Sequence, residues 1–236
     1  MPQTTLHLSH PAPSNPNLWG LIPCAGNGSR SGATGPKQYQ PIAGKAMVLH
    51  TLAAFAGVER LAGTLVVVSA GDDFFDALPV QVEACGGATR ALSVANGLDA
   101  LLQRGAALSD WVLVHDAARC LITPTQINSL IDACVDDVIG GLLALPLPDT
   151  LKAAKDGRVA ATLERSDKWL AQTPQMFRLG ELKSALLAAG DAVTDESSAM
   201  EFMGQRPLLV EGSAQNFKVT YPPDFALAES VLLSRA

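Results

Sequence analysis

The chain of 236 residues has few of the features that mark membrane, nucleic-acid-binding or disulfide-rich proteins. No apolar run reaches about 18 residues, so we expect no membrane-spanning helix. The net charge is −6 without a long basic run, which argues against a nucleic-acid partner held through its backbone. The four cysteines show no C-x-x-C pair and no metal-ligand spacing: Cys24, Cys85, Cys120 and Cys134. We interpret them as buried free thiols of a cytoplasmic protein.

Two common phosphate-binding patterns are also absent. A P-loop requires Gly-Lys-Ser/Thr, but Gly44-Lys45 is followed by Ala46. A dinucleotide fingerprint requires glycine or alanine five residues after its first glycine, and here Ser31 follows Gly26 at that distance.

A loop of small residues, 23–30, follows the first apolar run at 18–22. Successive backbone N–H groups in such a loop form a concavity that binds anions. A lone Gly-x-Gly is more often a surface turn, but this loop carries Arg30 and is followed by Pro36-Lys37. Two cations beside it favour a phosphorylated ligand whose charge grows during reaction.

Apolar runs and helical spacings alternate along the chain, which is 48% hydrophobic and 17% charged. We predict strands over 18–23, 64–69, 80–84, 111–115, 142–147, 169–173 and 208–210. We predict helices over 47–55, 73–78, 91–102, 181–189 and 195–203, one capped by Thr123 before Pro124, and one opening at Tyr221. This order predicts an α/β fold with a doubly wound, mostly parallel sheet and helices on both faces.

We expect residues 1–17 to form a mobile tail, because they contain four prolines and no signal-peptide pattern. Residues 18–236 are expected to form a single domain, whose length leaves no room for a fused second enzyme. Within it, the alternating polar stretch 149–162 has a turn at Asp156-Gly157 and predicts an extended hairpin. We assign about 146–168 to this arm.

Polar clusters follow the apolar runs at 26–30, 86–90, 116–119, 173–175 and 218–220. Ligands of doubly wound sheets bind at the carboxyl ends of strands, so these clusters predict one shared site. Individual members have ordinary alternatives. Arg90 suits a solvated turn, Asp116 a surface ion pair with Arg119, and Arg165 or Lys218 a surface cation. His115 suits a half-buried histidine with satisfied hydrogen bonds, and Thr194 a helix start.

Seven motifs, in chain order, carry a resemblance to a known family. They are Pro-x-Ala-Gly-x-Gly-x-Arg from Pro23, Pro-Lys-Gln-Tyr from Pro36, Gly-Gly-x-x-Arg-x-x-Ser-Val from Gly86, Val-His-Asp-Ala-Ala-Arg from Val114, Gln-Thr-Pro-Gln from Gln172, Thr-Asp-Glu-x-Ser-Ala from Thr194 and Asn-x-Lys-Val-Thr from Asn216. From about residue 18 to the C-terminus, the chain resembles the 2-C-methyl-D-erythritol 4-phosphate cytidylyltransferases. The resemblance implies a Rossmann-like nucleotidyltransferase fold and CMP transfer from CTP in the non-mevalonate isoprenoid pathway. It also implies a homodimer, a protruding dimerisation arm on which residues 149–152 would lie, and Mg²⁺ bound mainly through the phosphates of CTP.

The resemblance also implies roles for residues at matching positions. Arg30 and Lys37 would stabilise the transition state, and Lys218 and Arg165 would position the substrate phosphate, with Arg165 reaching from the other subunit. CTP would contact Pro23, Ala25, Gly26, Asn27, Gly28, Ser29, Gly87, Ala88, Arg90 and Ser93. The methylerythritol part of the substrate would contact Asp116, Arg119, Thr173 and Thr194.

Three departures from the family pattern and two alternative functions accompany this interpretation. Cys24 replaces an alanine, Cys120 replaces a proline, and Ala88-Thr89 replaces an acidic pair, which leaves base selectivity open. One alternative is a cytidylyltransferase for another polyol phosphate, such as ribitol 5-phosphate. The other is a regulatory subunit that binds CTP without catalysis. Neither needs a membrane or nucleic acid.

Overall fold

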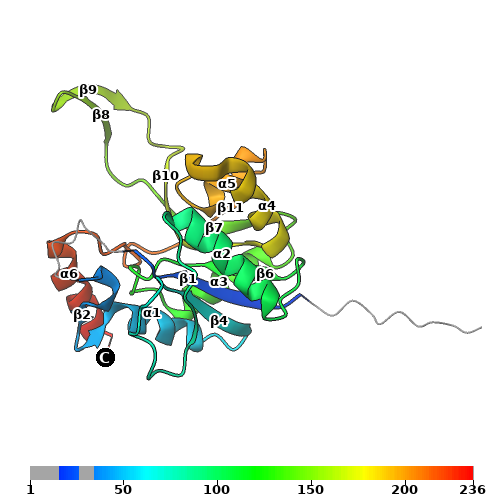
Figure 1. Cartoon of the computed structure of the whole chain (residues 1–236). Helices are drawn as coiled ribbons and strands as arrows, with labels where there is room; N and C mark the ends of the chain where they lie inside the picture. Colours follow the sequence, from blue (N-terminus) through cyan, green and yellow to red (C-terminus); the bar gives the residue numbers. More distant parts are fainter. Residues whose placement is uncertain (1–15, 27–34, 236) are drawn as a thin grey trace, which may run out of the picture.

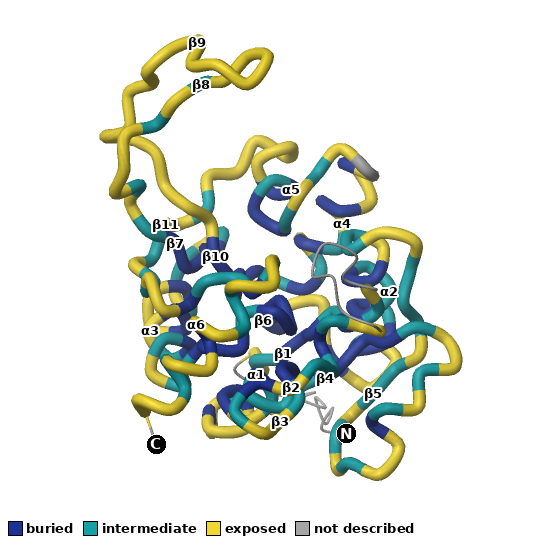
Figure 2. The backbone as a smooth tube through the Cα atoms, turned by 90° about the vertical axis from the view of Figure 1, so that its left-hand side faces the viewer, coloured by how far each residue is buried: buried dark blue, intermediate teal, exposed yellow. Residues whose placement is uncertain are grey.

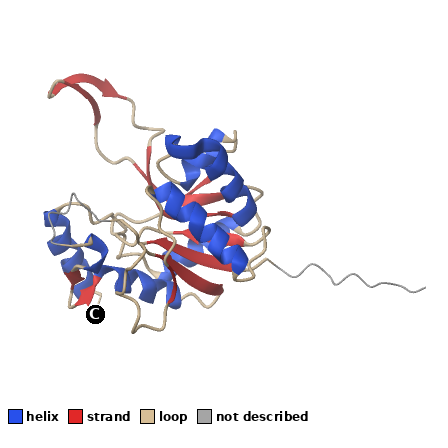
Figure 3. Cartoon of the chain, viewed as in Figure 1, coloured by secondary structure: helices blue, strands red, loops and turns tan. Residues whose placement is uncertain are grey.

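A seven-stranded sheet forms the centre of the computed structural model, which describes residues 16–26 and 35–235. The strand order is β11-β7-β10-β6-β1-β4-β5. The strands are β1 (Leu18–Pro23), β4 (Leu61–Val67), β5 (Gln81–Glu83), β6 (Trp111–Val114), β7 (Gly140–Pro146), β10 (Trp169–Arg178) and β11 (Leu208–Glu211). Figures 1 and 3 show helices on both sides of this sheet, as predicted.

The sheet is mostly parallel, and β10 is its antiparallel member. β1 pairs in parallel with β4 and β6, β4 with β5, and β7 with β11. β10 runs antiparallel to both β6 and β7. The sequence placed this strand over 169–173 within the parallel pattern. It is longer and reversed because the hairpin arm returns the chain directly beside β7, whereas a parallel return needs a longer crossover.

The described residues form the α-helices α1 (Met47–Ala56), α2 (Arg90–Gln103), α3 (Pro124–Cys134), α4 (Leu179–Ala189), α5 (Glu196–Phe202) and α6 (Pro222–Leu233), of which α6 packs beside β2 and the others on the sheet. Apolar side chains of α1 and α3 pack on one face of the sheet, and those of α2, α4 and α5 pack on the other. Adjacent strand residues serve different faces, since Ile22 joins the first core and Leu21 the second. Thr123 caps α3 with a capping box before Pro124, as predicted.

Short elements surround the first half of the sheet. The one-turn helix η2 (Lys37–Tyr39) precedes a small hairpin of β2 (Pro41–Ile42) and β3 (Lys45–Ala46). A second short turn, η3 (Gly190–Ala192), joins α4 to α5. The predicted helix over 73–78 is wrong, because that segment forms turns in which Phe74 and Phe75 pack against Tyr39.

The predicted hairpin is confirmed as β8 (Leu151–Lys155) paired with β9 (Arg158–Leu163). Its turn residues Asp156 and Gly157 have φ values of 51° and 74°, the positive values that a two-residue hairpin turn requires. Figures 1 and 2 show this hairpin standing away from the body, with nearly all its residues exposed. In the described structure the arm therefore adds little to either core.

The structured part of the chain includes Asn17, which the sequence assigned to the tail. Asn17 N donates to Asp110 Oδ1 at 2.9 Å, and Asn17 O accepts from Trp111 N at 2.8 Å. Residues 218–220 were predicted to end a strand, but they run without regular secondary structure between β11 and α6. No helix of the described ranges is both long and apolar enough to cross a membrane.

Candidate active site

A cleft of about 550 Å³ opens at the carboxyl edge of the parallel strands. The chain runs from β1 outward through β4 to β5 and then crosses to β6 on the other side of β1. Doubly wound sheets bind ligands at such a switch in strand order. The cleft is lined by segments that follow four strands, with side chains from η2 and from Lys218: Pro23, Cys24, Ala25, Gly26, Lys37, Gln38, Ser69, Gly87, Ala88, Thr89, Arg90, Ser93, Asp116, Ala117, Ala118 and Lys218.

The loop after β1 is held close to the ends of β4 and η2. Cys24 N donates to Val67 O at 2.7 Å, and Ser69 Oγ donates to Ala25 O at 3.0 Å. Burial raises the pKa of the Cys24 thiol to about 12, so this cysteine stays a neutral packing group. Asn27, Gly28, Ser29 and Arg30, predicted for this loop, lie outside the described residues.

The loop 86–89 passes so close to the first loop and to the end of β4 that Gly86 has no room for a side chain. A Cβ on Gly86 would stand 2.3 Å from the Cβ of Ala25 and 2.9 Å from Val68 O. Ser93 Oγ accepts from Gly87 N at 3.0 Å and donates to Thr89 O at 2.9 Å. The predicted CTP residue Ser93 therefore shapes the loop in addition to lining the cleft.

Arg90 lies between two carboxylates at the start of α2. Its Nε donates to Asp116 Oδ1 at 2.8 Å, and its two terminal nitrogens donate to Glu196 at 2.6 and 3.0 Å. Burial alone would lower the pKa of Arg90, but Glu196 and Asp116 outweigh burial and raise it. Glu196 is fully buried. Sequence reasoning missed this role, because an acid in the first turn of a helix has an ordinary explanation.

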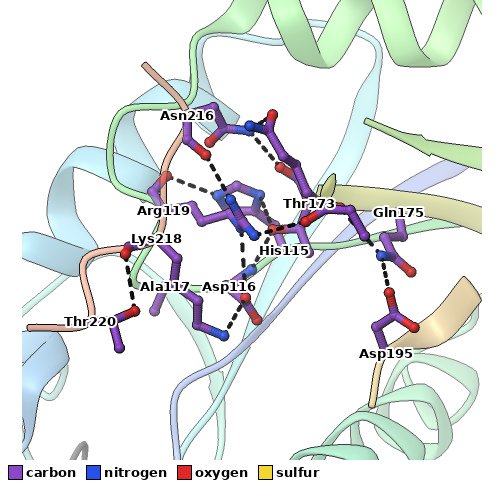
Figure 4. Close-up of polar contacts among 12 residues, drawn as sticks. His115, Asp116, Ala117, Arg119, Thr173, Gln175, Asp195, Asn216, Lys218 and Thr220 are labelled. Atoms are coloured by element: carbon purple, nitrogen blue, oxygen red, sulfur yellow. Dashed lines mark hydrogen bonds and ion pairs between the residues drawn. The ribbon is translucent and has the colours of Figure 1, made fainter. Parts of the chain in front are cut away.

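Asp116 lies among the cations of the site, of which Figure 4 shows Lys218 and Arg119. Besides Arg90, it accepts from Lys218 Nζ at 2.8 Å and lies 3.9 Å from Arg119 Nε. Burial would raise the pKa of this carboxyl, but Arg90 and Lys218 hold it well below its usual range. Asp116 is thus ionised at neutral pH, and the surface-pair interpretation does not describe its surroundings.

His115 is fully buried rather than half-buried, and its hydrogen bonds are satisfied as predicted. Its Nδ1 lies 3.0 Å from Thr173 Oγ1, and its Nε2 lies 3.2 Å from Arg119 O. Since a carbonyl only accepts, Nε2 carries the proton and Nδ1 accepts from Thr173. Burial lowers the pKa of His115 to about 4, so the ring is neutral at pH 7.

Residues 216–220 form no strand, and side-chain hydrogen bonds hold this segment in place beside the site. Arg119 donates to Asn216 O at 2.7 Å and to Ala171 O at 3.1 Å. Asn216 Nδ2 in turn donates to Thr173 O at 2.9 Å (Figure 4). Asn216 appeared in the sequence only as the first letter of a motif. The sequence could not show that Asn216 is buried, because hydrophobic periodicity indicates burial only in regular helices and strands.

The remaining predicted residues fall in three places. Lys37 lines the cleft, and its Nζ donates to Val219 O at 2.5 Å. Thr173 and Thr194 line an adjoining cavity of about 160 Å³, together with Arg90, Asp116, Arg119 and Lys218. Arg165 is exposed on the loop that joins the arm to β10, and it lines neither cavity.

A doubly wound sheet with small-residue loops and cations converging at its switch point is typical of nucleotide-binding enzymes. The family model described as "IspD: 2-C-methyl-D-erythritol 4-phosphate cytidylyltransferase" matches residues 18–234. The chain belongs to this family and is a cytidylyltransferase.

Individual relatives agree with this assignment. The chain is 52% identical to the 2-C-methyl-D-erythritol 4-phosphate cytidylyltransferase of Burkholderia vietnamiensis, over 94% of this chain and 98% of that protein. It is 69% identical to a bifunctional enzyme IspD/IspF of Albidiferax ferrireducens, but the match, over 94% of this chain, spans only about half (54%) of that protein's length. A crystal structure of a 4-diphosphocytidyl-2C-methyl-D-erythritol synthase superposes with a TM-score of 0.83 at 42% identity, over 93% of this chain and all of that one.

Proposed function

We propose that the cleft binds CTP and 2-C-methyl-D-erythritol 4-phosphate and transfers CMP to the latter. An oxygen of the substrate phosphate attacks the α-phosphorus of CTP, a new P–O bond forms, and the bond to pyrophosphate breaks. The observation that carries this proposal is the convergence of Lys37, Arg90 and Lys218 on a cleft lined by two small-residue loops. The products are 4-diphosphocytidyl-2-C-methyl-D-erythritol and pyrophosphate.

This reaction needs charge compensation rather than a general base. A phosphate monoester has a second pKa of about 6 and is already an anion at pH 7. The difficulty is repulsion between that anion and a triphosphate, which preorganised cations relieve. The neutral, buried His115 fits this requirement, because its two ring nitrogens already serve Thr173 and Arg119.

We assign the cations by their position in the cleft. Lys37, and Arg30 from the segment outside the described residues, offset the charge that builds on the α-phosphate. Lys218 leaves Asp116 to hold the substrate phosphate, and Asp116 then faces the hydroxyl groups of the methylerythritol part. The loops 23–29 and 87–93 surround the nucleotide, while Arg119, Thr173 and Thr194 complete the substrate side.

Magnesium fits the cleft as an ion held chiefly by the phosphates of CTP. Among the described residues, no cluster of three His, Cys, Asp or Glu side chains could hold a metal, and Asp116 is the acidic side chain lining the described part of the cleft. Mg²⁺ commonly takes one or two carboxylates together with substrate phosphates and water. Such an ion supplies positive charge at the reacting phosphate.

Arg165 requires a second subunit if it is to reach a substrate phosphate. It lies on the arm's return loop, and the arm presents apolar side chains to solvent in the single chain, with Val159 67% and Leu163 43% exposed. A projecting hairpin with exposed apolar side chains and little contact with its own chain is suited to covering a partner subunit. We therefore propose a homodimer in which each arm covers the partner and brings Arg165 to the partner's cleft. We also propose that this homodimer is cytoplasmic.

Pyrophosphate release by the purified chain tests the proposal. We expect release with CTP, Mg²⁺ and methylerythritol phosphate, and little with UTP or ATP. Faster release with ribitol 5-phosphate would identify the other polyol phosphate as the substrate. CTP binding without any release would identify a regulatory subunit. Near-normal turnover by Arg30→Ala would contradict the assignment of Arg30, for which we expect a loss in kcat of about 10²–10³.

A further inference from the structure

Tyr39 lies on the same helical turn as Lys37 but does not line the cleft. The turn, η2, spans only Lys37–Tyr39, and its backbone hydrogen bonds run from Tyr39 N to Pro36 O and from Gln40 N to Lys37 O, both at 3.1 Å. A single turn of this kind has little stability of its own. The direction in which Lys37 points therefore depends on what holds the turn in place.

Three consecutive side chains attach the turn to three different segments. Lys37 Nζ donates to Val219 O. Gln38 is buried, and its Nε2 donates to Cys24 O at 2.8 Å, at the start of the loop that lines the cleft. Tyr39 Oη donates to Asp72 Oδ2 at 2.5 Å.

Tyr39 adds ring contacts to its hydrogen bond. Its ring stacks on Phe74 with centroids 4.0 Å apart and planes within 4°, and it meets the edge of Phe75 at 5.8 Å. Asp72 is itself fixed, because its Oδ1 accepts from Phe74 N at 3.1 Å. The segment 72–75 thus holds Tyr39 through one hydrogen bond and two aromatic ring contacts.

We propose that Tyr39, through its hydrogen bond to Asp72, is a positioning residue that aims the Lys37 ammonium at the reacting phosphate. The inference rests on the role proposed above for Lys37. The contacts give a direct reason, since removing the Oη–Oδ2 bond frees the C-terminal end of η2 from the segment 72–75. Lys37 then samples orientations that contribute less to the transition state.

The Tyr39 hydroxyl can donate its hydrogen bond to Asp72 over the whole pH range of an activity assay. Burial raises the pKa of Tyr39, and the neighbouring Cys24 and Asp72 raise it further. The phenol therefore remains a hydrogen-bond donor to Asp72 from pH 6 to pH 9.

The test compares Tyr39→Phe with Trp19→Phe. The first removes only the hydroxyl and keeps the ring on Phe74. The second removes a donor to another carboxylate, since Trp19 Nε1 donates to Asp110 Oδ2 at 3.0 Å, at the far end of β1 from the cleft. We expect Tyr39→Phe to lower kcat about tenfold, with KM for both substrates within about twofold of the parent. Trp19→Phe should lose similar thermal stability and keep its kcat.

A double-mutant cycle with Lys37→Ala separates positioning from a general structural effect. If Tyr39 acts through Lys37, adding Tyr39→Phe to Lys37→Ala lowers kcat no further. An equal tenfold loss in both backgrounds overturns the inference, as does a kcat of Tyr39→Phe equal to that of Trp19→Phe. Near-normal turnover by Lys37→Ala alone would instead overturn the role proposed for Lys37, and the inference with it.

Discussion

Arg90 and Glu196 show how strongly a single buried pair can shape a site. The guanidinium meets the carboxylate through two hydrogen bonds, and Glu196 has no exposed surface. Such bidentate pairs have a defined geometry, and removing one partner leaves the other charge uncompensated. Since Arg90 also holds Asp116, a change at Glu196 reaches the centre of the cation cluster.

We expect Glu196→Gln to lower the free energy of unfolding by about 2 kcal/mol and to weaken CTP binding. A matched control is Glu83→Gln, because Glu83 pairs with Arg104 at 2.8 Å but both side chains are well exposed. An exposed pair contributes roughly 0.5 kcal/mol. Urea unfolding of the two variants makes the comparison, and equal losses would show that burial of the Arg90 pair has no energetic consequence.

Lys37 is the described residue whose loss should affect the chemical step most directly. We expect Lys37→Ala to lower kcat by roughly 10²–10³, the effect of one preorganised charge-stabilising donor. Lys45→Ala, on the exposed strand β3, should keep the parent rate. Single-turnover measurements separate the chemical step from product release. A loss confined to KM would mean that Lys37 binds substrate and transition state equally.

His115 predicts a stability change with pH. The unfolded chain takes up this proton near pH 6.5, but the folded chain takes it up only near pH 4 because burial lowers the pKa. The free energy of unfolding should therefore fall as the pH drops from 6.5 to 4, by at most about 3 kcal/mol from this residue. His115→Asn should flatten that slope, measured by urea unfolding at several pH values.

At the scale of elements, the helices and strands predicted correctly are those whose local sequence patterns agree with their tertiary surroundings. The buried strands β1 and β6 are continuous apolar runs, and Thr123-Pro124 and Asp156-Gly157 carry their own start and turn chemistry. The segment 73–78 has helical spacing, yet Phe74 and Phe75 are drawn to the ring of Tyr39 instead. Tertiary contacts override weak local preference in such short segments.

The sequence could predict those residues of the site that directly follow strands of the sheet. Loops after parallel strands share an edge, so residues such as Gly87 and Asp116 could be grouped from the sequence alone. Partners that approach from elsewhere could not be found this way. Glu196 reaches Arg90 across 106 positions of the chain, and Asn216 reaches Thr173 across 43. No periodicity in the sequence encodes which distant residue fills a buried gap.

At the scale of the whole molecule, the proposed dimer makes a sharp prediction. If Arg165 serves the partner's cleft, a mixture of Arg165→Ala and Lys37→Ala chains regains activity, because each mixed dimer has one cleft with both residues intact. Random mixing makes about half of the dimers mixed, so about a quarter of the parent activity should return. Refolded mixtures assayed for pyrophosphate release measure this. No recovery would place Arg165 in its own subunit's site or in none.

The neck of the arm has a consequence for how this protein tolerates change. Leu147 N donates to Lys168 O at 2.9 Å, and β7 then pairs with β10 from Pro146 opposite Trp169 down to Gly140 opposite Phe177, with a register shift between Ala171 and Gln175. The register that carries Thr173 to Asp116 is thus set below the neck and does not depend on the length of chain above it. Insertions or fused tags at the hairpin turn 156–157 should leave the fold around the chain's own cleft intact, whereas changes that displace Arg165 should lower activity in the partner's cleft.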